Sequence, residues 1–287
     1  MGRTVFVVNP KSANGKTGKE VEALRQRATT VLTDVEFLLT ERPGHATELT
    51  ARAIDGGAEC VVAVGGDGTN NEVINGFVNP DGTVRRAAAR FSFLPRGTGG
   101  DFRRTFGYGK DVDGALARIK GGSKPTDVGL LDFTRHDGGR GQRAFINIAS
   151  AGLSGMVDKM VNSTSKALGP MSFLVGSLKG LMAFHPYQMK ITIDGTLFHE
   201  GKAALGTAAN GQFFGGGMRV APAADPGDGL LDVTVLPAWG SARFIAQSGR
   251  LYAGDIREAA GVKVGRGRVI EMDSPEEVLL DVDGEQP

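Results

Sequence analysis

The stretch CVVAVGGDGTNNEVINGF, Cys60 to Phe77, joins an apolar run to a glycine-rich turn and then to a helical pattern. Two adjacent glycines after a strand let the backbone approach a ligand closely, and a helix that begins just beyond them points its free N–H groups at the same place. Such a turn suits a phosphate group. Asp67 is the unusual member, because a carboxylate beside phosphates is repelled unless it binds a metal ion or a hydroxyl. The alternative is a tight turn in which Asp67 and Thr69 cap the helix.

The same order of strand, turn and helix repeats through the first 125 residues. Each short apolar run there ends in a polar or glycine-rich turn, and the four turns read NPKSANGK, TERPGH, GGDGTNNE and PRGTGGD. This alternation predicts a parallel sheet covered by helices, and hence an α/β domain over residues 1–125. Ligands of open α/β sheets bind at the carboxyl ends of the strands, so we expect the four turns to converge on one crevice.

The pattern changes after Pro125. Strand-like runs dominate residues 126–287, and Asp194 with Gly195 has the sequence of a two-residue hairpin turn. Two helical patterns interrupt these runs, near Ser172 to Ala183 and Ser241 to Tyr252. The second part is therefore predicted to be an antiparallel, β-rich domain.

Composition limits the classes of function. The 287 residues suffice for two domains, and a net charge of +1 without a basic stripe argues against a nucleic-acid partner. One cysteine, Cys60, excludes an internal disulfide framework and fits a reducing compartment. The start lacks the pattern of a secretory signal, and uncharged runs such as Ala144 to Val157 are too short to span a bilayer. We expect a cytoplasmic protein that visits the membrane surface only transiently.

The sequence lacks three common site motifs. A P-loop at the first turn would match Gly15, Lys16 and Thr17, but Pro10 stands where its opening glycine is required. No GxGxxG fingerprint follows an early strand, and the four histidines lack zinc-ligand spacing.

Together, the remaining motifs resemble the diacylglycerol kinase catalytic-domain family, which includes bacterial lipid kinases and sphingosine kinases and is more distantly related to NAD kinases. The likeness rests on the order and spacing of NPKSANGK, TERPGHATELTARA, VGGDGTNNEVINGF, LPRGTGGDFRR, GGGMRVAPAADPGDGLLDVTVL and the closing DGE. It implies a Rossmann-like nucleotide-binding domain and an antiparallel β-sandwich domain, with ATP phosphates on the GGDGT turn in the cleft between them.

The resemblance also implies site residues. Nucleotide contacts would fall on Asn9, Pro10, Lys11, Ser12, Thr40, Gly66, Asp67, Gly68, Thr69, Asn70, Asn71, Glu72, Gly97 and Thr98. Gly100 departs from the pattern, because family members usually have asparagine there. The departure removes a side chain and puts in question the polar contacts that relatives make with it.

Phosphoryl transfer needs a base for the acceptor hydroxyl and neutralisation of the transferred group. The resemblance places the base in the closing VDGE, which supplies Asp283 and Glu285. Asp67, in the GGDGT turn, is a further catalytic candidate. Either Asp283 or Glu285 is compatible with that role. A solvated acidic turn is the alternative.

The segment APAADPGDGLLDV offers the carboxylates of Asp225 and Asp228 and the backbone carbonyl of Leu230, oxygen ligands that suit a hard cation. In relatives the matching segment holds Mg²⁺ away from the nucleotide phosphates, and a further Mg²⁺ arrives with ATP. A β-turn with solvated acids is the alternative here.

The sequence therefore predicts an ATP- and Mg²⁺-dependent lipid kinase that phosphorylates the free hydroxyl of diacylglycerol or a related lipid alcohol. Its expected membrane contact is peripheral, and a homodimer is left open. A soluble nucleotide kinase of the NAD kinase type is the nearer alternative, although it would not be expected to carry LPRGTGGDF and the closing DGE in this arrangement. A catalytically silent nucleotide- or lipid-binding regulator is the further one.

Overall fold

A computed structural model describes residues 2–97, 99–156 and 184–287. Two compact units make up the chain: unit 1 comprises Met1–Thr126 and Leu130–Ile146, and unit 2 comprises Asp127–Gly129 and Asn147–Pro287. The helix predicted near Ser172 to Ala183 and the predicted contact residue Thr98 lie outside the described residues.

Unit 1 is built on a four-stranded parallel sheet, as predicted. Its strands stand in the order β2-β1-β3-β4, and their bounds are β1 Thr4–Val8, β2 Val35–Leu39, β3 Cys60–Gly65 and β4 Arg90–Pro95. Strands β1 and β3 read as continuous apolar runs because both of their faces are buried.

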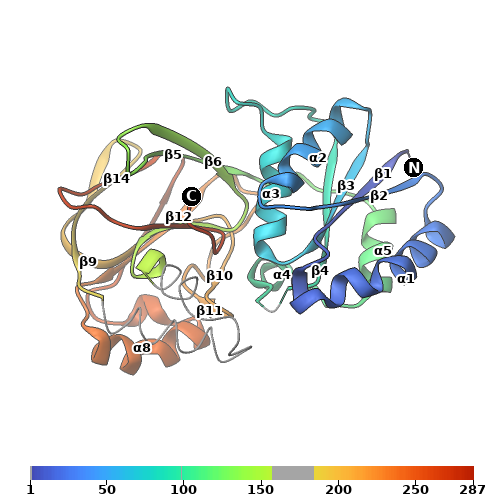
Figure 1. Cartoon of the computed structure of the whole chain (residues 1–287). Coiled ribbons are helices and arrows are strands. Elements are labelled where there is room, and N and C mark those ends of the chain that lie inside the picture. Colours follow the sequence, from blue (N-terminus) through green and yellow to red (C-terminus); the bar gives the residue numbers. More distant parts are fainter. Residues whose placement is uncertain (1, 98, 157–183) are drawn as a thin grey trace. The chain divides into compact units, whose positions relative to one another are not determined.

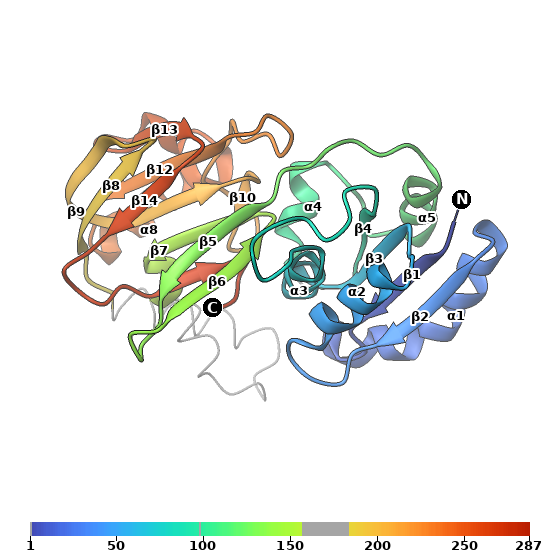
Figure 2. The same cartoon turned by 90° about the horizontal axis from the view of Figure 1, so that it is seen from above.

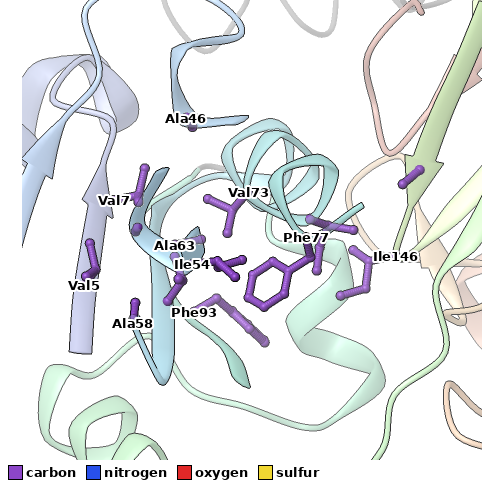
Figure 3. Close-up of a cluster of buried hydrophobic side chains, with 14 of the residues drawn as sticks. Val5, Val7, Ala46, Ile54, Ala58, Ala63, Val73, Phe77, Phe93 and Ile146 are labelled. Carbon is purple, nitrogen blue, oxygen red and sulfur yellow. The ribbon is translucent and has the colours of Figure 1, made fainter. Parts of the chain in front are cut away.

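Helices cover both faces of this sheet (Figure 1). They are η1 Ser12–Gly15, α1 Lys16–Val31, α2 His45–Asp55, α3 Asp67–Phe77, α4 Asp101–Thr105 and α5 Val112–Lys120. Side chains of α2 and α3 pack on one face around Val5, Val7 and Ala63, as Figure 3 shows. The helices α1 and α5 pack on the other face, against Phe6 and Val8.

A two-stranded ribbon, β5 Gly129–Thr134 and β6 Arg140–Phe145, packs against α3. The Asn75 side chain donates to the carbonyl of Ala144 at 2.9 Å and accepts from its N–H at 2.9 Å. Asn71 donates to the same carbonyl at 2.9 Å and accepts from Arg143 Nε at 2.8 Å. These bonds attach residues 130–146 to unit 1, although the sequence pattern places the division between the domains at residue 125.

Unit 2 contains an antiparallel seven-stranded sheet (Figure 2). Its main path runs β13-β12-β9-β7-β15, and β8 pairs with both β9 and β14. The strands are β7 Ile148–Gly152, β8 Tyr187–Ile193, β9 Thr196–Ala209, β12 Leu231–Pro237, β13 Lys263–Gly267, β14 Ile270–Asp273 and β15 Leu280–Val282. A small pair, β10 Phe213–Phe214 and β11 Met218–Arg219, and the helices α8 Ser241–Ala253 and η3 Ile256–Glu258 complete the unit.

The turn chemistry of unit 2 agrees with the sequence prediction. Asp194 and Gly195 have φ of 50° and 77° and join β8 to β9, as the hairpin signal requires. The predicted antiparallel, β-rich second part is confirmed, and the helix predicted from Ser241 to Tyr252 is α8.

Candidate active site

The turns that follow the strands of unit 1 begin at one edge of the sheet. Asn9 N donates to Val64 O at 2.9 Å and Thr40 N donates to Val8 O at 2.9 Å, so the turns after β1, β2 and β3 start level with one another. Between β1 and β3 the strand order reverses, and such a switch point is where open α/β sheets bind ligands. The expected convergence of the turns is present.

The GGDGT turn brings two backbone segments into close contact. A Cβ added to Gly97 would lie 2.5 Å from Gly66 Cα, so a side chain at Gly97 would push the two turns apart. Gly66 precedes α3 in an extended conformation, and because glycine has no side chain it provides no side-chain cap for the helix. The helix N-terminus is thereby left suitable for an anion such as phosphate.

Asp67, the first residue of α3, binds the start of α4. Its Oδ2 accepts from Gly100 N at 2.8 Å and from Asp101 N at 3.0 Å, and its Oδ1 accepts from Phe102 N at 3.4 Å. The carboxylate therefore caps a helix 33 residues further along the chain, and in this arrangement it stabilises the turn that carries Gly97.

Gly100 adopts a φ of 71°, in the left-handed region. Glycine and asparagine are the residues that most readily take this conformation, so the backbone at position 100 is compatible with either residue. The contacts of Gly100 with Asp67 are made by its backbone amide and need no side chain.

The first turn, NPKSANGK, is held in an uncommon conformation. Ala13 and Asn14 have φ of 51° and 55°, which is unusual for residues other than glycine and costs free energy. Asn9 fixes this loop to α3, because its Nδ2 donates to Thr69 Oγ1 at 3.3 Å while its Oδ1 accepts from Lys11 N at 3.0 Å. Backbone strain of this kind is concentrated at functional sites.

A pocket of about 210 Å³ lies between the first and last of these turns. Its lining residues are Ala13, Lys16, Thr17, Glu20, Pro95, Arg96, Gly97 and Lys110. Lys16, Arg96 and Lys110 make it cationic, and Glu20 offsets part of this charge through an ion pair with Arg96 at 3.4 Å. Lys110 Nζ donates to Gly97 O at 3.0 Å. Sequence reasoning missed Lys110, because an isolated lysine in a loop belongs to no motif.

Some predicted contact residues use their side chains within unit 1. Asn70 and Asn71 are buried, and Asn71 holds the β5–β6 ribbon as described. Glu72 Oε2 accepts from Ala46 N at 3.0 Å, at the start of α2. Pro10 and Thr40 lie on the turns at the carboxyl edge of the sheet, Ser12 begins η1, and Gly68 lies in the first turn of α3. The backbone of the edge is thus better suited to a ligand than the side chains of Asn71 and Glu72.

The closing DGE lies in unit 2 and forms a tight turn. Asp283 and Gly284 have φ of 54° and 86°, and Val282 and Glu285 exchange backbone hydrogen bonds of 2.8 and 3.1 Å. Asp283 is buried, and its Oδ1 accepts from the amides of Asn147 and Ile148, both at 2.9 Å. Glu285 is exposed. The turn separates a carboxylate that binds the backbone from a carboxylate at the surface.

The carboxylates of the 225–230 loop are bound to backbone amides and to an arginine. Asp225 Oδ1 accepts from Gly227 N at 3.1 Å, and Asp228 Oδ1 accepts from Leu230 N at 3.0 Å. The other oxygen of Asp228 pairs with Arg266 at 2.9 Å. No cluster of three or more metal-binding side chains occurs in the described ranges. As arranged, the loop fits an ion pair better than Mg²⁺, and its metal site stays a prediction.

Arg266 also pairs with Asp232, at 3.1 Å. Burial raises the pKa of the Asp232 carboxyl, while the hydrogen bond from Arg266 acts in the opposite direction. Arg266 therefore serves two carboxylates, and its guanidinium supplies the positive charge that a metal ion would bring to Asp228.

Similarity to known proteins extends over nearly the whole chain. The family model for the diacylglycerol kinase catalytic domain matches residues 3–131, and that for the YegS C-terminal NAD kinase beta sandwich-like domain matches residues 147–287. A YegS-like lipid kinase from Xanthomonas campestris pv. campestris is 30% identical over 98% of this chain and 88% of its own length. The chain belongs to the diacylglycerol kinase catalytic-domain family.

Two further members of this lipid kinase family show the same extent of similarity. The diacylglycerol kinase of Bacillus subtilis is 26% identical over 99% of this chain and 90% of its own. The crystal structure of a diacylglycerol kinase from Bacillus anthracis superimposes with a TM-score of 0.75 at 26% identity, again over 99% and 90% of the two chains. The predicted family and the predicted fold class are thereby confirmed.

Within the described part of the chain, no helix is long and apolar enough to cross a membrane.

Proposed function

We propose that this lipid kinase transfers the γ-phosphoryl group of ATP, bound with Mg²⁺, to the free hydroxyl of diacylglycerol or a related lipid alcohol. The proposal rests on the groups that gather at the carboxyl edge of the sheet in unit 1. There, the GGDGT segment joins the end of β3 to the N-terminus of α3 at the switch point of the sheet, next to a pocket with three cationic side chains. The printed names of the relatives from Bacillus subtilis and Xanthomonas campestris support the lipid acceptor.

The binding of ATP follows from the chemistry of this edge. Backbone N–H groups at the start of α3 and the ammonium groups of Lys16 and Lys110 suit a polyphosphate. The close contact of Gly66 with Gly97 leaves the backbone accessible to a phosphate, because neither residue places a side chain there. Mg²⁺ would enter with ATP, where it neutralises charge on the phosphates.

Glu285 is our candidate for the base that accepts the proton of the lipid hydroxyl. It is exposed, whereas Asp283 is buried and bound by two backbone amides. Hydrogen bonds to a carboxylate stabilise its charged form and so make it a weaker base. Asp283 would then act as a positioning residue, which holds the turn that presents Glu285.

Membrane contact of the enzyme would be peripheral and transient. The acceptor lipid resides in a bilayer, and the described residues contain no spanning helix. We expect weak, salt-sensitive sedimentation of the purified protein with liposomes that contain phosphatidylglycerol. Tight sedimentation that high salt does not reverse would contradict a transient contact.

The acceptor can be identified by supplying radiolabelled ATP and Mg²⁺ with diacylglycerol, monoacylglycerol, phosphatidylglycerol, sphingoid bases, ceramide and NAD in separate reactions. Label in one lipid would support the proposal and name the substrate. Label in NAD would place the protein with the nucleotide kinases. Measurable ATP binding with no label in any acceptor would support a catalytically silent regulator.

A further inference from the structure

A second cavity of unit 1 lies away from the nucleotide edge. It has a volume of about 140 Å³ and is lined along one side by Arg90, Phe91, Ser92 and Phe93, the first four residues of β4. Successive residues of a strand point to opposite faces, so a cavity that touches all four runs along the free edge of the sheet.

This cavity lies toward the amino ends of the strands. Cys60, the first residue of β3, contributes to its wall, whereas Gly65, the last residue of β3, begins the GGDGT turn. At about 3.3 Å per residue, β3 separates these two points by roughly 16 Å. The two cavities share no lining residue.

Aromatic rings form the body of the cavity. Phe102 packs on Phe93 with ring centroids 5.3 Å apart and on Phe106 at 5.1 Å, and Tyr108 stacks on Phe106 at 5.3 Å. Cavities of about 150 Å³ with apolar walls admit a molecule of the size of benzene. The aromatic side of this cavity therefore offers a wall to a flat apolar group of that size, while its other side carries polar residues such as Ser123 and Lys124.

Cations surround the aromatic walls. The Arg118 guanidinium lies 4.3 Å from the centroid of Tyr108, and Lys124 Nζ lies 5.2 Å from that of Phe106. Arg90 provides a third positive charge, and the described lining residues include no Asp or Glu. Arg118 Nη2 is enclosed and has no hydrogen-bond partner among the described residues. An enclosed donor of this kind calls for an acceptor, which an anion would supply.

We propose that this cavity is a binding site for a small amphipathic anion, a carboxylate attached to an apolar body of about the size of a benzene ring. The apolar body would lie among Phe93, Phe102 and Tyr108, and the carboxylate would accept from Arg118 with Lys124 nearby. Phe102 also donates its backbone amide to Asp67, so an occupant would contact the segment that supports the GGDGT turn.

The test uses 4-fluorobenzoate as the probe, with its binding to the full chain followed by fluorine NMR. We expect saturable binding by the wild type and a loss of affinity of about tenfold or more in Arg118→Met, because the methionine keeps part of the stem but cannot donate. The matched control is Arg25→Met, which removes a guanidinium 4.7 Å from the ring of Phe37, outside the cavity. It should leave the affinity unchanged.

Lys124→Met provides a second variant at an exposed position, in case Arg118→Met does not fold. 4-Fluorobenzylamine, with the opposite charge, and uncharged 4-fluorobenzyl alcohol should bind much more weakly than the carboxylate. The proposal is overturned if the alcohol binds as tightly as the acid, if no saturable binding occurs, or if only Lys110→Met weakens it. The last result would place the anion in the pocket at the carboxyl edge.

Discussion

The carboxylate of Asp67 binds the backbone amide of Gly100, with Oδ2 2.8 Å from the nitrogen. This bond and those to Asp101 and Phe102 join the GGDGT turn to the turn that carries Gly97. The acidic residue that looks out of place beside a phosphate site is thereby explained as a cap that joins two loops.

Asp67→Ala should lower the free energy of unfolding by about 1–2 kcal/mol, the usual cost of removing a helix cap. Asp67→Asn should lose less, because its amide retains one acceptor oxygen. Urea unfolding measures both effects, and ATP affinity should fall with stability at this position. Asp111→Ala is the matched control, since Asp111 caps α5 through Gly114 N. It should reduce stability and spare ATP affinity. Full stability of Asp67→Ala would refute the capping role.

Gly97→Ala should weaken ATP binding by roughly 10- to 100-fold, because its Cβ would lie 2.5 Å from Gly66 Cα and would displace the GGDGT turn, and overpacking of this kind costs about 1–3 kcal/mol. Calorimetric titration with ATP would measure the loss. Gly249→Ala serves as a control, because a Cβ there meets nothing within 4 Å. Unchanged ATP affinity in Gly97→Ala would show that the contact between the two glycines does not shape the nucleotide site.

The Arg266 ion pair predicts a response to magnesium. In Arg266→Gln the Asp228 carboxylate loses its cation, so Mg²⁺ should raise the Tm of this variant by more than it raises that of the wild type. Thermal unfolding with and without Mg²⁺ would show the difference, and Arg268→Gln controls for the loss of a nearby positive charge. An equal or larger Mg²⁺ effect in the wild type would mean that the metal displaces Arg266 from Asp228.

The buried thiol of Cys60 should make the free energy of unfolding fall at alkaline pH. Burial raises the pKa of its thiol to about 11. The folded protein thus keeps the thiol protonated to a higher pH than the unfolded chain does. The resulting contribution to stability is complete below about pH 9, the ordinary pKa of the thiol, and is lost as the pH rises through 11, for a total of about 2–3 kcal/mol. Cys60→Ala should flatten the fall in unfolding free energy between these pH values. An unchanged profile would rule out the thiol as its source.

Local patterns were sufficient to predict the fold. Apolar runs such as Thr4–Val8 and Cys60–Gly65 became parallel strands because both faces are covered, and Asp194–Gly195 specified a hairpin turn through its backbone preferences. The run RAFINIAS reads as one strand but is shared by β6 and β7, which belong to different units. A hydrophobic pattern does not indicate that the chain passes from unit 1 to unit 2 within this run.

The candidate site was less accessible to sequence reasoning, because its contacts join distant residues. Asp67 binds amides 33 to 35 residues away, and Asn71 binds the backbone of Ala144. Neither partner can be read from local spacing. Two glycines of the site are required for different reasons. Gly97 allows close contact with Gly66, and Gly100 adopts a positive φ. The sequence alone does not distinguish these two requirements.

The decisive measurement is the transfer of radiolabelled γ-phosphate from ATP to diacylglycerol by the wild type and by Glu285→Gln, with ATP affinity measured on the same preparations. We expect label in the lipid with the wild type, a fall in kcat of about 100-fold or more in Glu285→Gln, and unchanged ATP affinity. Wild-type transfer rates in Glu285→Gln would contradict the assignment of the base, and ATP binding without transfer to any lipid alcohol would contradict the kinase itself.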